Sequence, residues 1–368
     1  MQLEVNSQFL DLPGAVEATG PDAGVAAHYG NPLAEQRSLK AGKSVVDLTN
    51  NPVIEVSGVD RLSWLESMTS QKLTTLKPGQ SAEALLLGPT GRIDHVLKLI
   101  EDGSSIWILL ENSELEPVLS WLNSMRFMLR VEVVDRTDSF ATIGWFEVAG
   151  VDPGLQVASP HGVELTWRDP WNEVQTGGYQ YAEAEAEHYR QWTWRESLVE
   201  RSLLSHLDHR EFSGTLAAEA LRIAAWRPRF ATEVDEKSIP HELDWLRSAV
   251  HLTKGCYRGQ ETVAKVHNLG HPPRRLVLLQ LDGSENLMPT LGAEVMLDDK
   301  VVGSVTSVAN HFELGPIALA VVKRNTDPEA PLRVSVEGSS IPATQEVIVP
   351  VDAGATAPAP RLPRLGAR

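Results

Sequence analysis

The sequence predicts an α+β protein that ends in a small β-barrel. Residues 44–146 alternate β-rich runs with stretches whose apolar residues recur at helical spacing, which is typical of mixed sheets and helices. After Pro272 and Pro273 the pattern changes to short strand-like runs separated by Gly, Asp and Pro. This change of period marks the start of a separate, closed or nearly closed barrel.

The individual elements follow from local patterns. Residues 53–59 are β-rich, and Asp60 is a suitable cap for a helix over 61–68. Three strand-like runs come next, over 82–88, 92–100 and 105–111, and turn sequences separate them. They predict an antiparallel meander. A further helix is predicted to begin near Gly214 and to end before Pro228.

These patterns divide the chain into five segments. The 368 residues are enough for two or three domains. The tail is rich in Pro and Ala and has too little apolar surface to order itself. The segments are a loosely ordered stretch over 1–30, a first α+β segment over 31–150, a second α+β segment over 151–271, a β-barrel over 272–350, and a disordered tail over 351–368.

Composition excludes several classes of function. Lys and Arg number 33 against 49 Asp and Glu, so the net charge of −16 repels nucleic acid and anionic lipid surfaces. We therefore expect neither direct nucleic-acid binding nor membrane binding. The single cysteine suits a reducing compartment, and neither a transmembrane run nor a secretory signal is evident, so we expect a cytoplasmic protein.

The segment KGCYRGQE, residues 254–261, is the most informative motif. Lys254 and Arg258 place positive charge near Cys256, which favours the thiolate, and the glycines allow a tight backbone. Two interpretations are open at this point. Cys256 is either a reactive or ligand-contacting thiol, or a small buried apolar residue.

Two other places could contact a ligand. Strand alternation puts Asp94 on the same face as Val96 and Ile100, where its carboxylate could accept from the N–H groups of a pterin. On the predicted helix, Arg222 could clamp a ligand carboxylate while Trp226 stacks on a flat ring. The simpler alternatives are a solvated Asp94 and an ordinary surface ion pair between Glu219 and Arg222.

Motifs for metals and phosphates are missing from the sequence. His267 and His271 are spaced for zinc only on a helix, and the intervening Gly270 followed by Pro272 argues for a loop. No phosphate-binding loop, dinucleotide fingerprint or CxxC pattern occurs. We therefore predict no metal site.

The stretch from Ala220 to Arg275 resembles the YgfZ family of folate-binding proteins, which are relatives of the glycine cleavage T-protein. It contains ALRIAAWRPRF, DEKSIPHELDWL and LTKGCYRGQETVAKVHNLGHPPRR. The resemblance implies a T-protein-like folate-binding body of two intertwined α+β segments, followed by the barrel. It also implies tetrahydrofolate as the cofactor.

The resemblance assigns roles to residues in three places. It makes Cys256 the signature thiol and places a folate pocket beside it. The residues implied for chemistry are Cys256, Lys254 and Tyr257, and those implied for folate binding are Asp94, Arg222, Trp226, Gly255, Gly259, Gln260 and Glu261.

The implied function is that of an accessory protein for the assembly or repair of iron-sulfur enzymes, including those that thiolate tRNA. Iron-sulfur enzymes or their assembly proteins would then be its partners. The alternative is a folate-dependent aminomethyltransferase or another one-carbon transferase. A third possibility is a binding module without chemistry, in which a serine at position 256 would have no effect.

Overall fold

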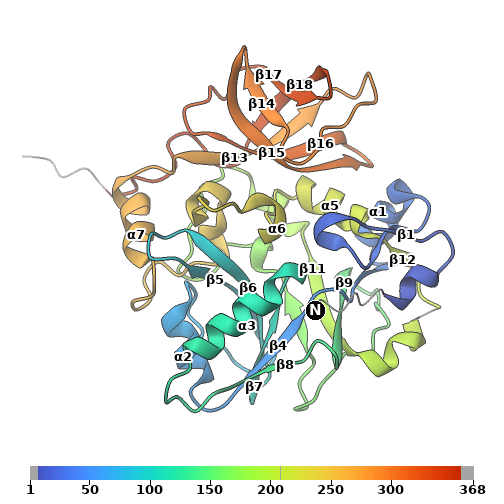
Figure 1. Ribbon diagram of the computed structural model, residues 1–368, viewed down its shortest axis with the longest axis vertical. Coiled ribbons are helices and arrows are strands. Elements are labelled where there is room, and N and C mark those ends of the chain that lie inside the picture. The colour runs from blue at the N-terminus through green and yellow to red at the C-terminus, as the bar shows by residue number, and fades with distance from the viewer. Residues whose placement is uncertain (1–6, 208, 358–368) are drawn as a thin grey trace, which may run out of the picture.

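The computed structural model describes residues 7–207 and 209–357. Figure 1 shows a body of sheets and helices with a barrel stacked on one end. The architecture confirms the predicted α+β class and the C-terminal barrel.

The first sheet has five antiparallel strands in the order β5-β6-β7-β4-β8. Its strands are β4 (Val53–Ser57), β5 (Ser81–Leu87), β6 (Ile93–Glu101), β7 (Ser105–Leu109) and β8 (Glu132–Asp135). Helices α2 (Arg61–Met68) and α3 (Leu115–Ser124) pack on one face of it through Leu65 and Leu122. The other face is turned toward the second sheet.

The second sheet has the order β10-β11-β9-β3-β12, and only its β3–β12 pair is parallel. Its strands are β3 (Val45–Leu48), β9 (Phe140–Phe146), β10 (Thr166–Arg168), β11 (Trp194–Glu200) and β12 (Phe212–Ser213). Both β3 and β9 come from the first α+β segment, so the two segments are intertwined. Apolar side chains from both sheets, such as Val96 and Trp194, form one shared core.

The remaining helices connect the body to the barrel. Helix α5 packs against α1 and against barrel strand β15, and α6 also contacts β15. The α-helices are α1 (Pro32–Lys40), α4 (Ala186–Arg190), α5 (Thr215–Ala224), α6 (Phe230–Glu233) and α7 (Gln260–Leu269). The 3-10 helices are η1 (Gln8–Asp11), η2 (Gly20–Asp22), η3 (Asn112–Glu114), η4 (Pro170–Asn172), η5 (Arg201–Leu207), η6 (Pro240–Leu243) and η7 (Trp245–Arg247).

The barrel is closed, with the strand order β13-β16-β15-β14-β17-β18. Its strands are β13 (Arg274–Leu281), β14 (Glu294–Leu297), β15 (Lys300–His311), β16 (Gly315–Lys323), β17 (Leu332–Val336) and β18 (Ser339–Val347). Alternate apolar residues, Val277 and Leu279 among them, fill its interior. The first barrel strand begins at Arg274, directly after the change of pattern at Pro273.

The two terminal segments are more ordered than their composition suggests. Residues 16–17 and 26–28 pair as β1 (Val16–Glu17) and β2 (Ala26–His28), and Phe9 packs on Phe212 at 4.4 Å between ring centroids. In the tail, the Thr356 N–H donates to the His267 carbonyl, and Ala353 is buried. Residues 1–6 and 358–368, which the sequence assigns to loose segments, lie outside the described residues.

Candidate functional site

A central cavity lies between the two sheets, beneath α5 and the segment 227–230. Its volume is about 720 Å³, part of it open to solvent. Concave sites lined by aromatic residues and a few polar groups are typical of small-molecule binding. Four tryptophans contribute to its wall, namely Trp167, Trp192, Trp194 and Trp245.

The arginines of the wall are held by carboxylates from distant parts of the chain. Arg227 donates to Asp169 at 3.0 Å and to Glu83 at 2.5 Å. Arg229 donates to Asp22, Glu111 and Glu219 at 3.0 to 3.2 Å. Burial alone would lower the pKa of each guanidinium, but the surrounding carboxylates raise both above the ordinary range.

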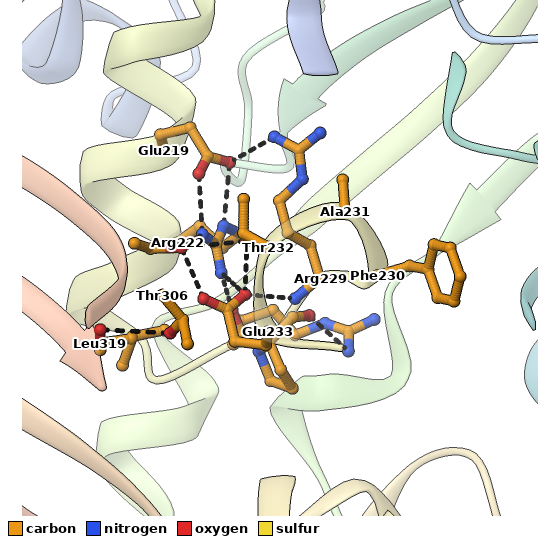
Figure 2. A network of polar contacts seen from close by, with 12 residues as sticks. Glu219, Arg222, Arg229, Phe230, Ala231, Thr232, Glu233, Thr306 and Leu319 are labelled. Carbon is orange, nitrogen blue, oxygen red and sulfur yellow. Dashed lines mark hydrogen bonds and ion pairs between the residues drawn. The ribbon is translucent and has the colours of Figure 1, made fainter. Parts of the chain in front are cut away.

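Arg222 lines the cavity but uses all five of its N–H groups within the protein. Figure 2 shows the network, in which its Nε and Nη2 donate to Glu219 at 2.9 and 2.7 Å. Further bonds join it to Glu233, to the Arg227 carbonyl and to Ser307 of the barrel. A guanidinium has five donors, so none is left to clamp a ligand carboxylate. The side chain instead links α5, α6 and β15.

Glu196 is the most unusual residue of the cavity. It lies on β11, is 3% exposed, and its Oε1 accepts from Lys98 at 2.6 Å and from Trp194 at 3.0 Å. Its Oε2 is buried without a hydrogen-bond partner in residues 7–207 and 209–357, and the same holds for Trp245 Nε1. Buried polar atoms are rarely left unpaired. Both residues line the cavity, so each brings a polar atom without a partner in the described residues to its wall.

The aromatic wall favours a flat ligand. Trp192 and Trp194 lie nearly parallel, with ring centroids 5.8 Å apart and an interplanar angle of 22°. The Lys98 Nζ sits 5.2 Å from the Trp167 ring centroid. A planar ring bound here would gain apolar contact from the indoles while its polar edge reached Glu196.

Asp94 does not line this cavity. A β-bulge in the β5–β6 pair sets Leu86 opposite His95 and Leu87 opposite Ile93, so Asp94 has no partner in the register. Ile93 therefore shares a core with Val96, which strict alternation would have put on opposite faces. Asp94 is exposed, and its carboxylate lies over Gly88.

The 254–261 loop lies against the 88–91 turn. Gly259 has φ +82°, and a Cβ there would come within 2.7 Å of the Gly88 carbonyl oxygen. The loop thus requires glycine for close approach. Gln260 and Glu261 begin α7, and Gly255 is exposed. The structure therefore brings the loop near Asp94, as the predicted site requires, but none of these residues lines the central cavity.

Within the loop, Cys256 is an exposed free thiol, while Lys254 and Tyr257 are buried. Lys254 Nζ donates to the carbonyls of Glu66, Thr69 and Gln71, at the C-terminal end of α2. Burial lowers the pKa of Lys254 to about 8. The same ammonium lies 4.9 Å from the Tyr257 ring centroid. Lys254 and Tyr257 thus hold the loop on the body and leave the thiol facing solvent.

Trp226 also lies outside the cavity wall. It follows α5 with φ +58°, a backbone conformation that favours glycine, and its ring lies 4.0 Å from that of His188. Of the residues expected to bind a ligand, only Arg222 lines the cavity. Glu196, Lys98 and Trp245 were not expected, because Glu196 lies between Arg195 and Ser197 in a mixed run that carries no distinct signal.

Two further observations concern the described residues. Among 7–207 and 209–357, no group of three or more His, Cys, Asp or Glu side chains is arranged to hold a metal ion. None of the helices in this part of the chain is both long and apolar enough to cross a bilayer.

Comparison with known proteins agrees with this architecture. Residues 274–351 match the glycine cleavage T-protein C-terminal barrel domain. The "Putative transferase At1g60990, chloroplastic" of Arabidopsis thaliana is 25% identical over 337 residues, which cover 85% of this chain and 74% of that protein.

Two other relatives carry different names. An aminomethyltransferase of Nostoc sp. is 26% identical, with 84% of this chain and 85% of that protein covered. The tRNA-modifying protein YgfZ of Yersinia enterocolitica is 24% identical, with 72% and 79% covered. The glycine cleavage system aminomethyltransferase T from Bartonella henselae has the same fold, with a TM-score of 0.71 at 17% identity over 94% of this chain and 96% of that one.

Proposed function

We propose that this chain, a relative of YgfZ and of the glycine cleavage T-protein, binds a reduced folate in its central cavity. We further propose that it acts as an accessory protein for the assembly or repair of iron-sulfur enzymes. The observation that carries the folate assignment is the pair of unpartnered atoms, Glu196 Oε2 and Trp245 Nε1, beside four tryptophans.

The residues of the cavity fit a pterin. A pterin is flat, carries ring N–H and amino donors on one edge, and has a carbonyl oxygen beside them. Glu196 Oε2 would accept from an N–H, Trp245 Nε1 would donate to the oxygen, and the indoles would pack on the ring. Tetrahydrofolate bound in this way supplies a carrier for one-carbon groups.

Replacement of Glu196 by glutamine should weaken tetrahydrofolate binding about ten- to a hundredfold, because a charged hydrogen-bond acceptor is lost. Calorimetric titration measures this directly. Glu313→Gln is the matched control, since it removes the same charge at a surface ion pair with Lys40, whose two charged atoms are 3.3 Å apart.

A second arm of the titration distinguishes two places for the folate. Asp94→Ala should bind like the parent protein, because Asp94 is exposed and does not line the cavity. If Asp94→Ala lost affinity while Glu196→Gln kept it, the folate would belong beside the 254–261 loop. If the parent protein bound no reduced folate at all, the proposed function would fail.

In this proposal, Cys256 is the group through which the folate-binding protein acts on its iron-sulfur partners. It is exposed and lies on a loop that the buried Lys254 and Tyr257 hold in position. We expect Cys256→Ser to fold and to bind folate normally, but to support iron-sulfur enzyme activity poorly in cells that lack the native protein. Serine keeps the size but has no easily formed anion and little affinity for soft metals.

The control for Cys256→Ser is Thr253→Ala, at an exposed residue of the same segment, which should restore activity fully. Enzyme activity is compared at equal protein levels. Complete restoration by Cys256→Ser would contradict a thiol function and leave the loop with a structural role.

A second candidate function is aminomethyl transfer, which the similarity to curated aminomethyltransferases favours. The two functions differ in one product. Formation of methylenetetrahydrofolate from an aminomethylated lipoyl carrier would establish the transferase in place of the accessory role.

A further inference from the structure

The charges that line the central cavity do not balance. The carboxylates are Asp22, Glu83, Glu111, Asp169, Glu196 and Glu219. The cations are Lys98, Arg222, Arg227 and Arg229. A largely buried site with this excess of negative charge favours a ligand that brings positive charge, because charges inside a protein are weakly screened.

Each of these cations donates to at least one carboxylate of the protein itself. Arg229 alone serves Asp22, Glu111 and Glu219, and all five of its N–H groups are used. Burial raises the pKa of Asp22, and the nearby Glu219 and Glu111 raise it further. Asp22 lines the cavity, and its side chain is 20% exposed.

Two independent features of the cavity would let this negative charge act on a bound ligand. Glu196, nearly fully buried, keeps one carboxylate oxygen without a partner in the described part of the chain. Four tryptophans line the same cavity, and indole rings attract cations more strongly than other aromatic rings do. Together they form a site with a negative edge and negative faces.

We infer that the group held in the central cavity is a planar cation. This inference rests on the proposed folate function and specifies the form of the folate. The 5,10-methenyl form carries its positive charge on the fused ring, whereas the 5-formyl form is neutral there. The acidic glutamate tail is common to both forms, so it does not contribute to a preference between them.

The test compares the two forms in the same protein. Quenching of tryptophan fluorescence is titrated with freshly prepared 5,10-methenyltetrahydrofolate and with 5-formyltetrahydrofolate, at a mildly acidic pH at which the methenyl ring persists. We expect the parent protein to prefer the cation by about tenfold or more. Glu196→Gln should reduce that ratio to about threefold or less, whereas Glu313→Gln should leave it unchanged.

Asp22→Asn provides a second variant in the cavity wall, in case Glu196→Gln does not fold. It should also reduce the preference for the cation. If both forms bind with equal affinity, or if the formyl form binds more tightly, the inference is overturned while the folate function stands. If neither form binds to the parent protein, the folate function fails, and the inference fails with it.

Discussion

Replacing Arg227 by methionine should lower the free energy of unfolding by about 3 to 5 kcal/mol, because it leaves buried carboxylates without their cation. Arg227 is 5% exposed, and its partners Glu83 and Asp169 are 1% and 3% exposed. Those carboxylates retain only neutral donors, Ser248 for Glu83 and Trp192 for Asp169 among them. Methionine keeps much of the length, so the loss of charge dominates.

Urea unfolding monitored by circular dichroism measures this effect. The matched control is Arg130→Met, which breaks an exposed ion pair with Asp60 and should leave the unfolding curve nearly unchanged. If Arg227→Met were no more destabilising than Arg130→Met, the buried network would not be holding the cavity wall together.

Asp244 should give the stability of the protein a distinct dependence on pH. It is fully buried, its Oδ1 accepts from the Tyr181 N–H at 2.7 Å, and burial raises its pKa to about 7 from an ordinary value of 3.8. Arg247, Tyr181 and Tyr189 are the charged or titratable groups that interact with it.

The sign follows from the proton that the folded state binds more tightly. Between about pH 4 and pH 7 the folded protein keeps a proton on Asp244 that the unfolded chain releases. The contribution of Asp244 to the free energy of unfolding therefore falls as the pH rises through 7. The difference in unfolding free energy between the parent protein and Asp244→Asn should change by roughly 2 to 4 kcal/mol across this window. Parallel stability curves for the two proteins would contradict the assignment.

The sequence predicts the architecture well because periodicity reports which faces are buried. The switch to short alternating strands after Pro273 predicts the barrel, and the turns at residues 88–91 and 102–103 predict the meander of the first sheet. The order of residues 7–30 is missed, because 3-10 turns and very short strands leave no regular pattern.

The cavity is harder to predict, because its groups meet only through the tertiary fold. Glu83, Asp169 and Arg227 come from three separate parts of the chain and form one buried cluster. Strict alternation misplaces Asp94, because a single-residue bulge shifts the register of β6 at that point. Nor can the sequence reveal that all five N–H groups of Arg222 donate to neighbouring protein groups.

The most direct test of the central claim is a crystal structure of the protein with bound tetrahydrofolate. We expect the pterin inside the central cavity, with a ring N–H within hydrogen-bonding distance of Glu196 Oε2 and the ring against the tryptophan wall. A pterin bound instead at the surface between Asp94 and Cys256, with the central cavity filled only by water, would contradict it.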